Sequence, residues 1–410
     1  MNKERKHYKI VITALLAVFI TILVIIYSEN AFNAAVEGLK VWWEIVFPSL
    51  LPFFIIAEIL MGLGVVHFLG ALLEPLMRPL FKVPGVGALA MAMGLASGYP
   101  IGAKITANLR SKKLCTKTEG ERLVSFTNTA DPLFMIGAVA VGMFHRADLA
   151  IIIAGSHYIS SILIGFIMRF YKGNKKSHDG NKNVKRNNSN NNIFSTAYYE
   201  LINARYNDGR NFGELMGDAV KESIHTLLLI GGFIILFSVI TEMIVVTGLV
   251  NIIGKAFIIV LQPLKISGES ILPLISGFFE ITNGANMASQ TTAPLLEKLI
   301  ITNAVIAWSG LSVHAQVATM VNNTDIKLKP YIFARILQAV FASVITVIIY
   351  VPFSQKVSEV MSYNTVDITA LKNYLTYLPL LVVVILLITV FISLLIYFLR
   401  KVKIIIFHHH

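Results

Sequence analysis

Charged residues are scarce in this sequence. Only 14% of the 410 residues are Asp, Glu, Lys or Arg and 55% are hydrophobic, whereas a soluble domain is about 25% charged. The mean hydropathy is +0.70. Such a chain must place most of its surface in lipid. Its long apolar runs predict a multi-pass integral membrane protein of the all-α class.

Cysteine is nearly absent as well. Cys115 is the only one, which excludes a disulfide scaffold or a cysteine-rich zinc cluster. The sequence has no Gly-x-Ser-x-Gly elbow, P-loop or HExxH motif, and its histidines lack the spacing of metal ligands. We therefore predict no enzyme, no cofactor and no metal. The last three residues, 408–410, resemble the remnant of a tag.

The apolar runs predict about eight transmembrane helices, because roughly 20 apolar residues cross a bilayer as a helix. The first follows a basic N-terminus and precedes no small-residue cleavage site, so it reads as a retained signal anchor. The eight predicted spans are residues 10–27, 38–61, 122–144, 148–171, 222–246, 297–321, 330–351 and 374–399.

Four other apolar segments differ from these spans. Residues 65–83 and 249–264 contain charges or prolines and predict two helices that lie in the membrane interface. Residues 85–109 and 269–292 are rich in glycine and small residues, and each breaks at a polar turn. Non-helical backbone at membrane depth must be buried in protein or line a cavity. We therefore predict two re-entrant hairpins, with ordinary spans packed through glycines as the alternative.

The net charge of +12 could indicate nucleic-acid binding, but its distribution indicates orientation. With the N-terminus in the cytoplasm, 27 basic residues fall on the cytoplasmic side and 7 on the other, and Arg335 lies near the start of a span. Basic residues concentrate in cytoplasmic loops. We therefore predict a cytoplasmic N-terminus and no nucleic-acid partner.

The predicted elements occur twice in the same order: a span, an interfacial helix, a hairpin and two spans. Each unit crosses three times and the intervening loop adds no crossing, so the repeats are inverted. Inverted repeats with broken helices are typical of secondary transporters, which hold substrate near the bilayer midplane. The predicted domains are a signal-anchor span (1–37), the first repeat (38–171), a basic disordered cytoplasmic loop (172–218), the second repeat (219–352) and a C-terminal span (353–407).

Polar residues at the hairpin tips and in the following spans form the candidate site. A helix that begins after Pro100 would offer free N–H groups to an anion, and Lys104 follows it. Glu280 could bind a cation, relay a proton, or pair with Lys104 or Arg335. Both basic side chains could instead extend to the cytoplasmic surface. The predicted substrate-binding residues are Ser97, Gly98, Tyr99, Gly102, Lys104, Thr127, Asn128, Thr129, Glu280, Thr282, Asn283, Gly284, Asn286, Ser309 and Ser312.

Four further residues are candidates for coupling or gating: Asp131, His314, His157 and Arg335. His157 and Arg335 occupy matched places in the two repeats, and Asp131 with His314 could form a proton path. The alternative for the polar span residues is hydrogen bonding between helices. The coupling ion, sodium or proton, stays open.

Four motifs carry a resemblance to a known family: FPSLLPFF (47–54), GLASGYPIGAK (94–104), FTNTADPLFMIG (126–137) and GFFEITNGANMAS (277–289). The chain resembles the sporulation integral membrane proteins of the YlbJ (SpoVV) type. These belong to the nucleoside-recognition or Gate domain superfamily, with concentrative nucleoside transporters as wider relatives. The resemblance implies a role in sporulation and transport of dipicolinic acid across the outer forespore membrane, which is derived from the mother cell.

The leading hypothesis is a transporter of a small anionic metabolite, with dipicolinic acid implied by the resemblance. A nucleoside or nucleobase transporter is the first alternative. Those transporters place acidic groups at the first hairpin, and this chain has Ser-Gly-Tyr-Pro there, which argues against it. The second alternative is a non-transporting structural or partner-recruiting protein. The expected partners are the anionic substrate and the lipid bilayer, and a homo-oligomer is compatible with the sequence.

Overall fold

Helices form every regular element in the part of the chain that the computed structural model describes, residues 2–172, 193–252, 254–255 and 266–361. The predicted span 374–399, the last three histidines, the first part of the predicted loop 172–218 and most of the predicted interfacial helix 249–264 lie outside these residues, so their predictions stand untested. The rest of the predicted disordered loop is largely helical, in α9 (Ile193–Asp208) and the start of α10 (Phe212–Val246).

Five helical segments are long and apolar enough to cross a membrane, and they match five of the eight predicted spans. They are Ser28–Gly62, Ala147–Met168, Phe212–Val246, Leu295–Val321 and Leu328–Tyr350. The first comprises α2 (Ser28–Lys40), a π-helical stretch η1 (Val41–Val46) and α3 (Phe47–Gly62); the second comprises η4 (Ala147–Leu149) and α8 (Ala150–Met168). The others are α10 (Phe212–Val246), the pair α14 (Leu295–Trp308) and α15 (Gly310–Val321), and the N-terminal part of α16 (Leu328–Met361).

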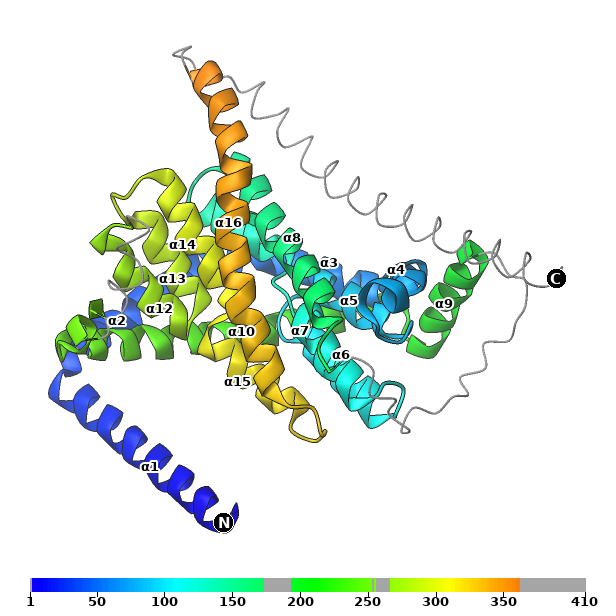
Figure 1. Ribbon diagram of the computed structural model, residues 1–410, viewed down its shortest axis with the longest axis horizontal. Coiled ribbons are helices and arrows are strands. Elements are labelled where there is room, and N and C mark those ends of the chain that lie inside the picture. The colour runs from blue at the N-terminus through cyan, green and yellow to red at the C-terminus, as the bar shows by residue number, and fades with distance from the viewer. Residues whose placement is uncertain (1, 173–192, 253, 256–265, 362–410) are drawn as a thin grey trace.

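Two of the other predicted spans lie in the described residues. The helix α1 (Asn2–Ile26) runs without a break over nearly all of the predicted span 10–27 and projects away from the body of the molecule (Figure 1). The predicted span 122–144 is split into α7 (Lys117–Thr127) and the π-helix η3 (Phe134–Met143). Pro132 has no N–H to donate and disfavours helical backbone at the residue before it, which favours a break here.

Short helices in pairs occupy the two segments predicted as hairpins. In the first half α5 (Gly87–Ser97) and α6 (Ile101–Ser111) pack together, and in the second half α12 (Ile271–Phe279) and α13 (Ile281–Gln290) do the same. Gly98 begins the first turn with φ +69°, a conformation that glycine adopts without strain. Whether these pairs turn back inside a bilayer stays a prediction.

Outside these pairs, α4 (Val65–Leu76) and the π-helix η2 (Met77–Phe81) cover the segment predicted as interfacial. The helix α4 packs between α5 and α9 (Ile193–Asp208). A one-turn 3-10 helix, η6 (Gly268–Ser270), precedes α12. Figure 1 shows α9 at the edge of the molecule, on the far side of α4 from the body.

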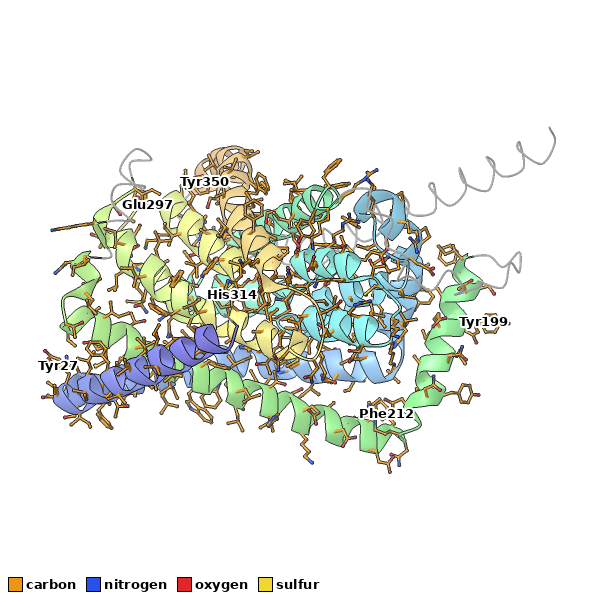
Figure 2. All side chains as sticks on the ribbon, turned by 60° about the horizontal axis from the view of Figure 1, so that its bottom comes forward. Tyr27, Tyr199, Phe212, Glu297, His314 and Tyr350 are labelled. Carbon is orange, nitrogen blue, oxygen red and sulfur yellow. The ribbon has the colours of Figure 1, made fainter. Side chains whose placement is uncertain are left out.

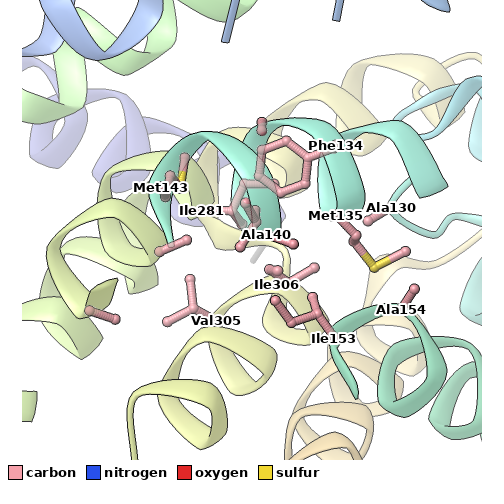
Figure 3. Packing of buried hydrophobic residues seen from close by; sticks show 14 of the residues in the cluster. Ala130, Phe134, Met135, Ala140, Met143, Ile153, Ala154, Ile281, Val305 and Ile306 are labelled. Atoms are coloured by element: carbon pink, nitrogen blue, oxygen red, sulfur yellow. The ribbon is translucent and has the colours of Figure 1, made fainter. Parts of the chain in front are cut away.

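The largest buried cluster joins the two halves of the chain. Met135 of η3 and Ile153 of α8 pack against Val305 and Ile306 of α14, and all four side chains are buried. Figure 3 shows these side chains gathered between the helices. Because lipid is as apolar as these residues, close van der Waals packing holds such an interface together. The polar breaks described below lie next to this cluster.

Candidate functional site

The first polar break lies between α7 and η3, and buried side chains hold its free carbonyls. Arg335 of α16 donates one N–H to the carbonyl of Asn128 at 3.1 Å and another to the carbonyl of Ser125. Ser161 of α8 donates its hydroxyl to the carbonyl of Phe126 at 2.9 Å. Arg335 is completely buried, so it does not extend to the cytoplasmic surface.

Two neighbouring residues of α8 hold the next part of the same break. The Nε2 atom of His157 accepts the N–H of Ala130 at 3.3 Å and lies 2.8 Å from Thr129 Oγ1. The hydroxyl of Tyr158 donates to the carbonyl of Ala130 at 3.2 Å. A ring nitrogen that accepts an N–H carries no proton. His157 is therefore a neutral ring with its proton on Nδ1.

The second break separates α14 from α15, and the first helix pair reaches it. Ser309 and Gly310 adopt φ values of +79° and +68°, which ends one helix and begins the next. The Tyr99 hydroxyl, at the turn between α5 and α6, donates to the carbonyl of Ile306 at 3.1 Å and accepts from Ser309 Oγ at 2.9 Å. Trp308 donates its indole N–H to the carbonyl of Phe278 in α12. Each break is therefore held by side chains from distant segments.

Glu280 lies at the turn of the second helix pair and caps α13. Its carboxylate accepts the N–H of Asn283 at 2.8 Å and the hydroxyl of Thr282 at 3.2 Å. Asn283 in turn donates its side-chain amide to the carbonyl of Ile234 in α10. Among the described residues Glu280 makes no ion pair with Lys104 or Arg335, so the predicted pairing does not form.

A small central cavity of about 60 Å³ connects the two helix pairs with the two breaks. The walls come from both halves of the chain. Five of the predicted residues line it, and Gln316 of α15 and three phenylalanines are among the other lining residues. The polar and aromatic lining is Tyr99, Asp131, Glu280, Thr282, Ser312, Gln316, Phe54, Phe134 and Phe233.

A larger cavity of about 470 Å³, which we call the first vestibule, adjoins the central cavity. The two cavities share Tyr99 and Gln316 in their walls. The exposed side chain of Lys104 lines this vestibule together with Ser97. One small ligand in this space could therefore reach both side chains, and Glu58, Glu222, His225 and Thr226 line it as well.

A second vestibule of about 530 Å³ lies along the other end of α13. It is lined by Asn283 and Asn286 of that helix, whereas Glu280 and Thr282 at the start of the same segment line the central cavity. Its remaining polar wall includes Glu37, Glu44, Glu242 and Gln290. The molecule therefore has a narrow central cavity with one large vestibule on each side of it.

Several predicted site residues have packing roles. A Cβ atom on Gly102 would lie 2.2 Å from the carbonyl oxygen of Thr127, and one on Gly98 would lie 2.5 Å from Asp131 Oδ2. A Cβ on Gly284 would lie 2.3 Å from the Cα of Gly277. These glycines allow backbones to approach closely, as in other membrane helix contacts.

Asp131 and His314 do not form the proton path that the sequence suggested for this pair. Asp131 accepts the N–H of Phe134 at 2.8 Å and thus begins η3. The His314 ring packs edge-on against Trp308 and Tyr331, with ring centroids 4.4 and 5.3 Å away. Figure 2 shows His314 within the helical body. In the described part of the chain no hydrogen bond joins Asp131 to His314.

Sequence reasoning missed three residues that hydrogen-bond to the first break, Tyr158, Ser161 and Tyr331, and one that lines the central cavity, Gln316. Each is a polar residue within an apolar span, which was the available signal. Tyr331 accepts the side-chain amide of Asn128 at 3.1 Å. Their roles depend on partners far away in the chain, so local pattern alone could not assign them.

These features define a helical membrane protein in which broken helices from two halves of the chain surround a central cavity. The family model described as Gate, nucleoside recognition, matches residues 43–173 and 227–358. The chain is also 45% identical to the sporulation integral membrane protein YlbJ of Bacillus subtilis (strain 168) over 334 residues, which cover 82% of this chain and 81% of that protein. The chain belongs to the nucleoside recognition (Gate) family and is an integral multi-pass membrane protein of the YlbJ type.

One solved structure, a variant of CNTnw in an outward-facing state, has a TM-score of 0.43 and 11% sequence identity to this chain. The aligned part covers 84% of this chain and 86% of the CNTnw chain. This likeness is too weak to define the fold.

Proposed function

We propose that this protein is a secondary transporter that moves a small planar anion, dipicolinic acid, across the outer forespore membrane by alternating access. The observation that carries this proposal is the narrow central cavity between two vestibules, with walls from both halves of the chain. A substrate can reach such a centre from each side in turn when the two halves move relative to one another.

The first vestibule supports an anionic substrate. Its volume of about 470 Å³ admits a small ring compound, whereas the central cavity of about 60 Å³ does not in this conformation. Lys104 supplies a positive charge, and the Ser97 hydroxyl is a further donor. Glu58 and Glu222 line the same space, so a carboxylate would bind at the Lys104 side of the vestibule.

The membrane topology is part of the proposal. We infer eight spans with a cytoplasmic N-terminus, arranged as two inverted repeats. The 27 to 7 distribution of basic residues supports the orientation. The Gate model matches residues 43–173 and 227–358, and these segments nearly coincide with the two predicted repeats.

A nucleoside or nucleobase is the second candidate substrate. Glu280, Thr282 and Gln316 line the central cavity, and a carboxylate beside hydroxyl and amide groups can accept hydrogen bonds from ribose hydroxyls. The description of the family as nucleoside recognition agrees with this candidate. The absence of an acidic residue in the turn Ser97–Pro100 favours the anion.

Labelled dipicolinate in proteoliposomes tests the proposal. We expect exchange well above that of empty liposomes. Lys104→Ala should lower it by about tenfold or more, because a charge-assisted hydrogen bond contributes about 1.5–3 kcal/mol. Lys112→Ala is the matched control, since Lys112 lines a different cavity beside His67 and Glu200, and it should transport normally.

Two results would contradict the proposal. Uptake of uridine or adenosine without dipicolinate would establish the nucleoside alternative. A correctly folded protein that moves neither compound would indicate a non-transporting protein that recruits a partner.

A further inference from the structure

A line of buried polar residues runs along one face of α16. Tyr331, Arg335, Gln338 and Thr346 recur at intervals that place them on the same side of a helix, and each is at most 1% exposed. From Tyr331 to Thr346 the line is about 22 Å long at 1.5 Å per residue. That is most of the roughly 30 Å hydrocarbon core of a bilayer.

Polar residues of two other helices face this line, and we call the whole the α16 seam. The helix α16 lies between α8 and α14 (Figure 1) and packs against both. Gln338 donates to the carbonyl of His157 in α8 at 3.3 Å, and Asn303 of α14 donates to Thr346 Oγ1 at 2.7 Å. The seam ends at the first break, where Arg335 holds the carbonyl of Asn128.

The seam retains unused hydrogen-bonding capacity. Among the described residues, four fully buried polar atoms of the seam have no protein partner: His157 Nδ1, Asn303 Oδ1, Arg335 Nε and Gln338 Oε1. Ser156 Oγ and Thr302 Oγ1, on the residues next to His157 and Asn303 in the chain, are also fully buried and have none. Ordinary polar contacts between membrane helices would use these atoms. Leaving one such group unpaired costs about 1–3 kcal/mol.

The unpartnered atoms are of both kinds. His157 Nδ1 and Arg335 Nε donate, Asn303 Oδ1 and Gln338 Oε1 accept, and the two hydroxyls do either. A buried water needs two to four polar partners and connects donors to acceptors. A file of such waters passes a proton by shifting hydrogen bonds, so that one proton enters at one end as another leaves.

We propose that the α16 seam binds a file of internal waters and conducts the protons that drive transport. This inference rests on the proposed transport function and names the proton as its coupling ion. The proton would reach the first break, whose backbone is held by His157 and Arg335 and therefore responds to changes at the seam. The titratable or charged groups next to the seam and the break are His157 and Tyr158 of α8, Tyr331 and Arg335 of α16, Tyr99, His314 of α15, Asp131, and Glu121 of α7, which accepts the Lys327 N–H just before α16. Asn303 of α14, which faces Thr346, and its chain neighbour Thr302 are neutral.

The test uses two substitutions that remove no protein hydrogen bond. Ser156→Ala and Thr302→Val delete only hydroxyls without a protein partner. Ser343→Ala is the control, because the Ser343 hydroxyl of α16 already bonds the carbonyl of Ala339 in its own helix at 2.9 Å. Each full-length variant is reconstituted with labelled dipicolinate.

We expect the Ser156→Ala/Thr302→Val double variant to exchange dipicolinate at equal pH within about twofold of the unmodified protein. Accumulation driven by a proton gradient should fall by about tenfold or more, as expected when a membrane proton relay is interrupted. The control should do both normally.

Accumulation that is unchanged in the double variant, or that follows a sodium gradient instead, would overturn the inference while leaving the transport function intact. Absence of exchange in the unmodified protein would overturn the transport function and the inference with it.

Thermal denaturation gives a readout that needs no substrate. A rise in Tm of the double variant would also overturn the inference, since removing truly unpaired polar groups stabilises a dry site.

Discussion

Arg335 shows how a single residue connects the two halves of the molecule. It is a fully buried guanidinium with no carboxylate within ion-pair distance among the described residues. Its N–H groups bind the carbonyls of Ser125 and Asn128, more than 200 positions earlier, and its charge lies 5.5 Å from the centre of the Tyr331 ring. The planar fork of arginine reaches the two carbonyls with two separate nitrogen atoms, whereas all three donors of a lysine lie on a single nitrogen.

Arg335→Lys should therefore destabilise the protein. At least one carbonyl at the first break would lose its donor, at a cost of about 1–3 kcal/mol, and the Tm in detergent should fall. Arg146→Lys is the control, because Arg146 pairs with Asp148 in a partly exposed loop and such pairs contribute at most about 1 kcal/mol. Equal shifts for the two variants would contradict the role assigned to Arg335.

At the scale of elements, glycine decides how closely the first helix pair approaches the first break. Gly94 of α5 and Gly102 of α6 both face the carbonyl of Thr127, and a Cβ on either would lie within 2.2 Å of that oxygen. The neighbour is backbone, so it cannot rotate away as a flexible side chain would. The breaks themselves were predictable from local signals such as Pro132. The contact between α6 and α7 was not.

Gly102→Ala tests this packing. We expect a loss of about 1–3 kcal/mol from overpacking and a lower yield of folded protein, measured by Tm and by size-exclusion chromatography in detergent. Gly217→Ala in α10 adds a methyl group where no atom lies within 4 Å and should be neutral or slightly stabilising, because alanine favours helix. A neutral Gly102→Ala would show that the break moves freely.

At the scale of the whole molecule, the loop between α15 and α16 joins the two halves of the chain by contacts to α6 and α7. Arg110, at the end of α6, makes two hydrogen bonds to Asp325 at 2.7 and 3.0 Å. Nearby the Lys327 N–H donates to Glu121 at 3.3 Å. The hydrogen bonds from Arg110 lower the pKa of the Asp325 carboxyl, so the ionised form is the stabilising one.

The sign of the pH dependence follows from that shift. Asp325 should stabilise the fold above its unfolded pKa of about 3.9, and the stabilisation should disappear as pH falls through the lower pKa of the folded protein. Because the Asp325 side chain is 46% exposed, the effect should stay below about 1 kcal/mol. Asp325→Asn should lower the Tm slightly at pH 6, and the difference should vanish at the most acidic pH. A difference that grows on acidification would contradict this account.

The sequence by itself determined the class of protein, because lipid requires apolar surface and internally satisfied backbone whatever the fold. It also located both breaks and both helix turns, since glycine, proline and polar clusters act on the backbone beside them. The tertiary structure alone decided which distant groups meet. Tyr99 reaches Ser309 across 210 positions, Arg335 reaches Ser125 across the same separation, and the α16 seam needs three helices. Such contacts depend on packing between segments, and no local pattern specifies them.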